Sequence, residues 1–285
     1  RDTTRPNKMD AEAHDRVGRF ERVGIICAGV SADMLVNYPL WISAKRISAG
    51  LTLPTLREVY KGSGSLLFAL GPMIIAQDTS LALMLHAVDG HLEPTTAHAT
   101  CACLSGAIGA LTVGAQVEGV ITRAHATKQS VWQATCSTYR TGGLLSIVAP
   151  HGALAIAGRE IPYAGCLFFL SGWIRERLHE AWPVATVSAE HSTAGGSVLR
   201  DMLAAVLTAL VAGPLSQPPA VVAAHQQAHA VSLTAAFRAI ALSGGLGGFY
   251  SGLLARTGSL AGSLFVMPFT VETVQQMLER RRAQS

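Results

Sequence analysis

Six apolar segments constrain this 285-residue chain more than any other feature of its sequence. They cover residues 23–42, 66–88, 98–121, 151–174, 198–221 and 249–271. An α-helix needs about 20 mainly apolar residues to cross a bilayer. Charged residues make up 14 % of the chain and its mean hydropathy is +0.34, whereas soluble domains carry about 25 % charged residues. The sequence therefore predicts an all-α membrane protein with six transmembrane helices; a large Ala-rich soluble core is the alternative.

Several ionisable residues interrupt these segments or lie at their edges. They are Asp33, Asp78, Glu118, Arg159, Glu160, Asp201 and Arg256. A charge inside a membrane is costly and usually faces the interior of a helix bundle or a water-filled cavity. The pattern therefore favours a bundle with a polar centre over helices that face lipid on all sides.

Other classes of protein find little support in the sequence. The net charge of +4 is too small to indicate a nucleic-acid partner, and the five cysteines form neither a CxxC motif nor a secreted disulfide framework. His225 and His229 have the i, i+4 spacing of a metal-binding pair, but no third ligand is evident. No nucleophile–base pair or phosphate-binding loop is recognisable. We therefore expect no enzyme activity, no cofactor and no metal.

The connections between the segments repeat a pattern. Short amphipathic runs that follow a Ser or Thr cap and end at glycines are expected at 53–61, 129–140 and 232–243. We interpret the chain as an N-terminal tail (1–22), a membrane domain (23–275) and a C-terminal tail (276–285). The domain divides into three repeats, at about 23–90, 98–180 and 198–275.

The charges of the connections indicate an orientation. Connections 43–65, 122–150 and 222–248 carry eight basic residues and one acidic residue, whereas 89–97 and 175–197 carry two basic and five acidic residues. The positive-inside rule places the first group on the cytoplasm-equivalent side and both termini on the other.

Several motifs resemble those of the mitochondrial carrier family, over nearly all of residues 23–275. "GFYSGLLARTGSLAGSLFVMPFTVE" (248–272) is similar to the entry into an even-numbered carrier helix. The Gly71-Pro72 region occupies the same place in the first repeat, and "GREIPY" resembles the second. "AGVSADMLVNYPL" resembles the first carrier helix, which leads into a signature proline. The resemblance implies a pseudo-threefold barrel of six tilted helices, with short surface helices on the matrix side.

The resemblance also implies a matrix-side gate, which is degenerate here. The family's odd helices end in P-x-D/E-x-x-K/R-x-R, whose acids and bases form a ring of ion pairs. The first repeat keeps Pro39 and Arg46, with Trp41 and Ala44 at the acidic and basic positions. The second keeps Glu118 and Arg123, with Gln116 and Ile121 at the proline and basic positions. The third keeps Pro218 and Gln227, with Ala220, Ala223 and His225 at the acidic, basic and distal positions. Only Glu118 of six ring charges remains, and the opposite gate has no matching set.

This loss leads to further expectations for individual residues. Helices are expected to kink at Pro39 and Pro218, and the third helix, with Gln116, should be straighter. Trp41 should pack near Ile121 or Ala223 as an apolar plug. Glu118 should have no ring partner and be satisfied by Arg123 or another subunit. Arg159 is a candidate cavity contact, or else a packing residue paired with Glu160 or Asp201.

An alternating-access carrier needs two states of similar free energy, which breakable charge rings help to provide. Loss of the rings therefore favours a degenerate, non-transporting accessory subunit of a respiratory complex or ATP synthase assembly. The expected location is the mitochondrial inner membrane, with both termini toward the intermembrane space and with lipids and other subunits as partners. A divergent but active carrier of a small anionic metabolite or nucleotide is the alternative, favoured by Pro39, Pro218, Arg46, Arg123 and Arg159.

Overall fold

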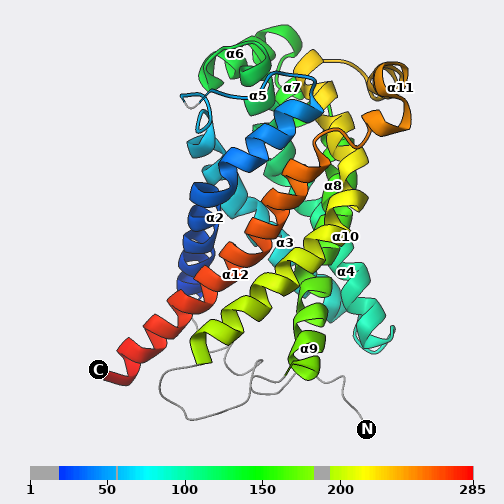
Figure 1. The fold of residues 1–285 in the computed structure, drawn as a ribbon. Coiled ribbons are helices and arrows are strands. Elements are labelled where there is room, and N and C mark those ends of the chain that lie inside the picture. The colour runs from blue at the N-terminus through cyan, green and yellow to red at the C-terminus, as the bar shows by residue number, and fades with distance from the viewer. Residues whose placement is uncertain (1–18, 56, 183–192, 285) are drawn as a thin grey trace.

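The computed structural model describes residues 19–55, 57–182 and 193–284, which are almost entirely helical and contain no strand. Long helices run along the length of the molecule, and several short helices lie at its upper end in Figure 1. The helices are α2 (Arg19–Ser48), α3 (Ser63–Val88), α4 (Pro94–Gly109), η1 (Ala110–Gly114), α5 (Ala115–Ala126), α6 (Val131–Gly142), α7 (Leu145–Val148), α8 (Ala153–Gly165), η2 (Cys166–Leu170), α9 (Ser171–Ala181), α10 (Thr193–His229), α11 (Leu233–Gly248) and α12 (Leu253–Gln284).

The long helices form a closed ring in chain order. α2 packs on α3, α3 on α4, α4 on α8, α8 on α10, α10 on α12, and α12 returns to α2. Figure 1 shows α6, α7 and α11 at one end of this ring and the C-terminal end of α12 at the other. We call these the α6 end and the α12 end. Every long helix therefore has two neighbours and can direct one face toward a common interior.

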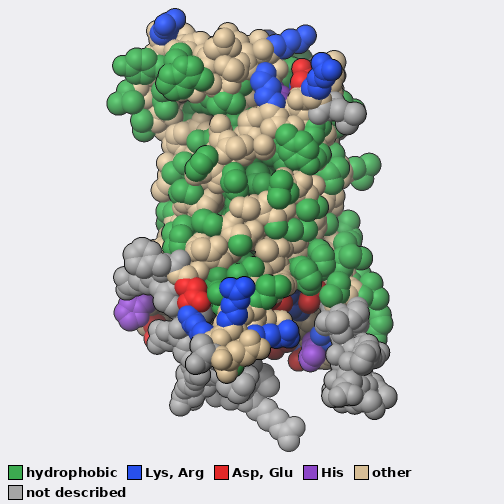
Figure 2. Space-filling model, turned by 90° about the vertical axis from the view of Figure 1, so that its left-hand side faces the viewer, with side chains coloured by type: hydrophobic (Ala, Val, Ile, Leu, Met, Phe, Trp, Pro, Cys, Tyr) green, Lys and Arg blue, Asp and Glu red, His purple; other side chains and the backbone are tan. Residues whose placement is uncertain are grey.

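Five stretches of the described chain are long and apolar enough to cross a membrane. They are Val23–Ser48, Ser63–Val88, Pro94–Ala126, Leu145–Ala181 and Val198–His229. Figure 2 shows charged side chains gathered toward the two ends of the molecule, with a largely apolar band between them. The prediction of an all-α protein with membrane-spanning character is confirmed for these five stretches. α12, which includes most of the sixth expected segment, is not among them.

The expected surface helices have mixed outcomes. Ser130 caps α6 with a full capping box that includes Gln133, and the Ser232 side chain caps α11, so the second and third are confirmed. The helix expected at 53–61 is wrong, because residues 57–62 form turns and 51–55 have no regular structure. Pro54 disfavours helical backbone at the residue before it.

The structure describes only part of the two expected tails. Residues 1–18 lie outside the described residues, and 19–22 already belong to α2. At the other end, residues 276–284 continue α12 and do not form a separate tail.

The expected kink positions lie inside unbroken helices. Pro39 is within α2, and Pro218 is within α10 together with Pro214 and Pro219. The third stretch contains the π-helical segment η1 just before Gln116, an irregularity with no clear sequence signal. Its greater straightness stays a prediction.

Pro39 leaves the carbonyl of Leu35 without its usual helical donor, because proline has no N–H. The Tyr60 hydroxyl donates to this carbonyl at 2.9 Å. The connection after α2 thereby supplies the hydrogen bond that the proline removes, which fixes that connection against the outside of the helix.

Replacing Tyr60 by Phe should destabilise the protein by about 1 kcal/mol, because the Leu35 carbonyl loses its donor. The measurement is thermal unfolding of the purified protein in detergent. Tyr139→Phe is the matched control, since Tyr139 is exposed on α6 and its hydroxyl forms no hydrogen bond among the described residues. Equal stability of the two variants would contradict this role of Tyr60.

Candidate functional site

A group of four buried charged residues lies inside the helix ring, and we call it the interior cluster. Its members are Lys45 on α2, Glu118 on α5, and Arg159 and Glu160 on α8. Each is less than a tenth exposed. Charged residues this deeply buried are rare unless they are paired.

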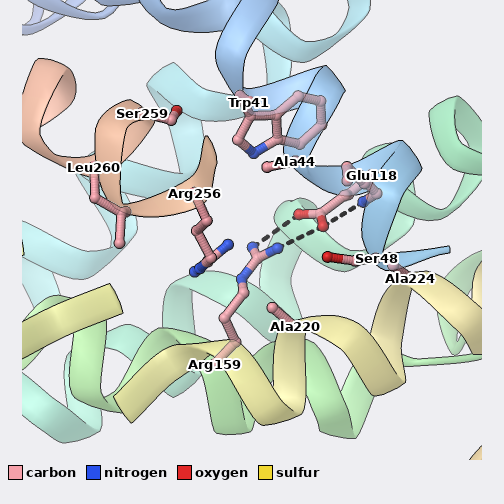
Figure 3. Close-up of a pocket in the computed structure, with 11 residues that line it drawn as sticks. Trp41, Ala44, Ser48, Glu118, Arg159, Ala220, Ala224, Arg256, Ser259 and Leu260 are labelled. Atoms are coloured by element: carbon pink, nitrogen blue, oxygen red, sulfur yellow. Dashed lines mark hydrogen bonds and ion pairs between the residues drawn. The ribbon is translucent and has the colours of Figure 1, made fainter. Parts of the chain in front are cut away.

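Glu118 is the centre of the interior cluster. Arg159 donates from Nη1 to its Oε1 at 2.5 Å and from Nη2 to its Oε2 at 2.8 Å. Lys45 Nζ forms a further ion pair with Oε1. Arg159 also pairs with Glu160, at 2.5 Å from Nη2. Figure 3 shows the bidentate Arg159–Glu118 pair across the interior. The cluster therefore joins three helices that are far apart in the sequence.

The expectation that Glu118 lacks a ring partner is wrong. Its partners are Lys45 and Arg159, and the half-buried Arg123 is not among them. The motif alignment placed Ala44 at the basic position, whereas the lysine at the next position reaches Glu118. The sequence did contain a signal for this pairing: a basic residue at position 45, one place from the expected basic position and in the last turn of the helix.

Arg159 was expected either to contact a cavity or to pack between helices and pair with Glu160 or Asp201. Its pairing with Glu160 is confirmed. Asp201, the alternative partner, instead pairs with Arg175 at 3.1 Å.

Trp41 lies on the inner side of the ring. It stacks on Tyr38 with ring centroids 5.5 Å apart and packs against the apolar cluster that contains Ile121. The ammonium group of Lys45 lies 5.1 Å from the centre of the indole ring, within the range of a cation–π contact. Packing of Trp41 in this apolar cluster agrees with the expectation, and its action as a gate plug stays a prediction.

The other residues of the expected gate are spread around the α6 end. Arg46 donates to the Thr52 carbonyl at 2.5 Å and lies 3.4 Å from the Glu58 carboxylate. The backbone N–H of Thr55, and Arg46 to a lesser extent, hold the pKa of Glu58 below its usual value. Arg46 therefore organises the connection after α2.

On α10, Gln227 accepts a hydrogen bond from the Thr122 hydroxyl at 2.9 Å, which joins α10 to α5. Pro218 lies inside α10, as described above.

A second ionic group lies toward the α12 end, and we call it the end cluster. Arg175 on α9 pairs with Asp201 on α10 at 3.1 Å and with Glu272 on α12 at 2.8 Å. Arg282 on α12 pairs with Glu21 on α2. These groups are more exposed than the interior cluster. The comparison with carrier motifs did not reveal them, because the chain has no set of residues that matches the family's opposite gate.

Two small cavities adjoin the interior cluster, with volumes of about 30 and 80 Å³. Trp41, Glu118, Arg159 and Arg256 line both. A water molecule needs about 10–15 Å³ of such space. The interior therefore has room for a few waters or one small molecule, but not for a nucleotide.

The ionisable side chains that line the two cavities are balanced in formal charge. The basic groups are Lys45, Arg159 and Arg256, and the acidic groups are Asp33, Glu118 and Glu160. Lys45 borders only the smaller cavity, and Asp33 and Glu160 border only the larger one. Acidic and basic side chains from different helices therefore line the same interior space.

Histidines 225 and 229 form no larger ligand group. Their rings are 4.4 Å apart, and the Nε2 of His229 lies 3.4 Å from the Ala49 carbonyl oxygen. The described residues contain no group of three or more His, Cys, Asp or Glu placed to hold a metal ion.

Comparison with known proteins adds no family assignment. No protein-family model matches the chain, and no curated protein sequence is detectably similar to it. The functional interpretation therefore depends on the geometry above and on the motif resemblance.

Replacing Glu118 by Gln should destabilise the protein by about 3–5 kcal/mol, because Lys45 and Arg159 would lose their shared carboxylate while staying buried. A Glu118 without a ring partner, as the sequence suggested, would have predicted only a small effect of this change. Glu279→Gln is the control, since Glu279 is exposed near the end of α12. Thermal unfolding of both variants in detergent measures the effect. A Glu118→Gln protein as stable as the control would show that the cluster contributes little.

Proposed function

We propose that this chain is a degenerate, carrier-like protein of the mitochondrial inner membrane that serves as a non-transporting accessory subunit. Its partner would be a respiratory complex or an ATP synthase assembly. The observation that carries the proposal is the interior cluster, in which Glu118 is held by two cations from two other helices.

The cluster favours a fixed shape. Opening the ring at this level would separate Glu118 from Lys45 or Arg159 inside a membrane. Breaking a buried ion pair is strongly unfavourable, because it leaves a charge without compensation. Alternating access needs two states within a few kcal/mol of each other. The small interior cavities fit the same interpretation, since they hold only a few atoms.

The proposed architecture has six spans in three repeats, with α12 as the sixth. Closure of the helix ring by α12 supports it. So do three glycines with left-handed backbone that open α3, α8 and α12: Gly62 (φ 87), Gly152 (φ 88) and Gly252 (φ 80). Six crossings would place both termini on one side, the intermembrane space. Protease-accessible tags at the two ends would test this arrangement, and tags on opposite sides would exclude it.

The outer surface suits lipid and partner helices. Several large apolar side chains are more than four-fifths exposed, namely Phe68, Leu246 and Leu254. Without a membrane or partner these side chains would face water, so lipids and neighbouring subunits are the proposed contacts.

A divergent, active carrier is the second candidate. It is favoured by the end cluster, because ion pairs there could open and close while the interior cluster rearranges. Proline in α2 and α10 and the charged cavity walls point in the same direction.

The two candidates differ in two measurements on gently solubilised membranes and purified protein. The accessory role predicts migration within a complex far larger than 29.8 kDa on native gels, with inner-membrane subunits co-purifying. It also predicts no uptake of metabolites or nucleotides by proteoliposomes. Migration as a single small species, together with uptake of a metabolite or nucleotide by the wild-type protein, would overturn the proposal in favour of the carrier.

A further inference from the structure

The α6 end carries large apolar side chains that the described residues leave uncovered. We call them the α6–α7 surface, which consists of Trp132, Tyr139, Leu144 and Leu145, with exposed fractions of 75 %, 55 %, 67 % and 74 %. Figure 2 shows apolar side chains at the surface of this end, close to basic ones. Exposed apolar side chains that are contiguous and bordered by polar groups typically mark an interaction site.

Most of the α6–α7 surface lies outside the stretches that are long and apolar enough to cross a membrane. The third stretch ends at Ala126 and the fourth begins at Leu145, so Trp132, Tyr139 and Leu144 fall between them. Figure 1 shows α6 at the end of the helix ring. Water, lipid headgroups or another protein are therefore the available surroundings of α6, and lipid tails are not.

The exposed side of α6 mixes aromatic and polar side chains. Trp132 and Tyr139 are seven residues apart and form one row along the helix. Gln133 and Arg140 form the adjacent row, and both are also exposed. A helix that lies on a bilayer separates its apolar face from its polar face, whereas Trp, Tyr and Arg are enriched at the positions that dominate binding in protein interfaces. The composition therefore favours a protein over a lipid surface.

The two short helices are held in a fixed arrangement. Ala134, on the inner side of α6, is fully buried, and the capping box at Ser130 fixes the start of the helix. The Ser146 hydroxyl lies 2.9 Å from the Thr138 carbonyl oxygen and 2.8 Å from that of Gly143. These contacts join α7 to the end of α6. A surface that is ordered before binding loses less conformational freedom on binding.

Basic charge accompanies the α6–α7 surface. Residues 119–158 contain Arg123, Lys128 and Arg140 and no acidic residue. Lys128 and Arg140 are exposed, and neither forms an ion pair among the described residues. Opposite charge on a partner speeds association and helps to exclude wrong partners. The complementary occupant therefore carries Asp or Glu side chains next to apolar ones.

From these observations we infer that the α6–α7 surface is the docking site for an acidic, amphipathic segment of a partner subunit. The apolar side chains of this segment pack against Trp132, Leu144 and Leu145, and its carboxylates pair with Lys128 and Arg140. The inference rests on the proposed accessory role and adds where on this chain the partner binds and by what chemistry.

The first test compares variants of the full-length chain on native gels of gently solubilised membranes. Trp132→Ala and Arg140→Glu should each move most of the chain from the large complex to a species near 29.8 kDa, because such positions often change affinity more than about tenfold. Trp182→Ala, at another exposed tryptophan, and Arg238→Glu, at an exposed position on α11, are the matched controls and should leave the complex intact. Unchanged thermal unfolding of the purified variants in detergent separates lost docking from misfolding.

A zero-length carbodiimide cross-link tests the chemistry of the partner, because it joins a lysine directly to a carboxylate that touches it. Lys128 should be joined to an Asp or Glu of a subunit of the same complex, as identified by mass spectrometry. Lys128→Arg should abolish this product, because the guanidinium group keeps the charge but does not react.

The outcomes separate this inference from the accessory role on which it rests. A large complex that withstands both Trp132→Ala and Arg140→Glu, or that gives no carboxylate cross-link to Lys128, would overturn the docking site and leave the accessory role in place. An intact complex with less co-purified phospholipid in these variants would assign the surface to lipid headgroups and also overturn it. A wild-type chain that migrates alone would overturn the accessory role itself, and the docking site with it.

Discussion

The pairing of Glu118 with Arg159 and Lys45 is the interaction on which the arrangement of this protein depends. It brings together α2, α5 and α8 in the interior of a closed helix ring. In a membrane the hydrophobic effect does not draw helices together, so packing and polar contacts between helices carry more of the association. Because all three side chains are buried, the pairs are weakly screened by solvent and restrict how far these helices can separate.

The sequence was sufficient to predict the helical class, most helix positions and a Ser or Thr cap at the start of the two short helices α6 and α11, because apolar length and capping are local properties. It did not predict that Lys45 reaches Glu118, since a shift of one residue changes helix face and only tertiary packing decides which side chain points inward. The turns at 57–62 depend on Pro54 and on the contacts of Arg46 with Thr52 and Glu58. The π-helical segments η1 and η2 likewise have no local sequence signature here.

The two ionic groups differ in character, and this difference bears on function. The interior cluster is buried and forms short contacts between helices distant in the sequence. The end cluster is partly exposed, so water and salt weaken its pairs. The weaker pairs of the end cluster are those that an active carrier would open and close, whereas the firm pairing in the interior is suited to a fixed scaffold. The interior cluster is therefore the physical basis for preferring an accessory role.

The most direct test of a fixed ring is the distance between spin labels at each end, measured by pulsed electron paramagnetic resonance in a cysteine-free background. Leu53 and Thr141 are exposed at the α6 end, and Leu92 and Met277 are exposed at the α12 end. If the ring is a fixed scaffold, the pair at the α6 end gives one narrow distance population. The distance at the α6 end then stays the same when the distance at the α12 end varies. Two populations at both ends, with one end widening as the other narrows, would contradict the account and indicate alternating access.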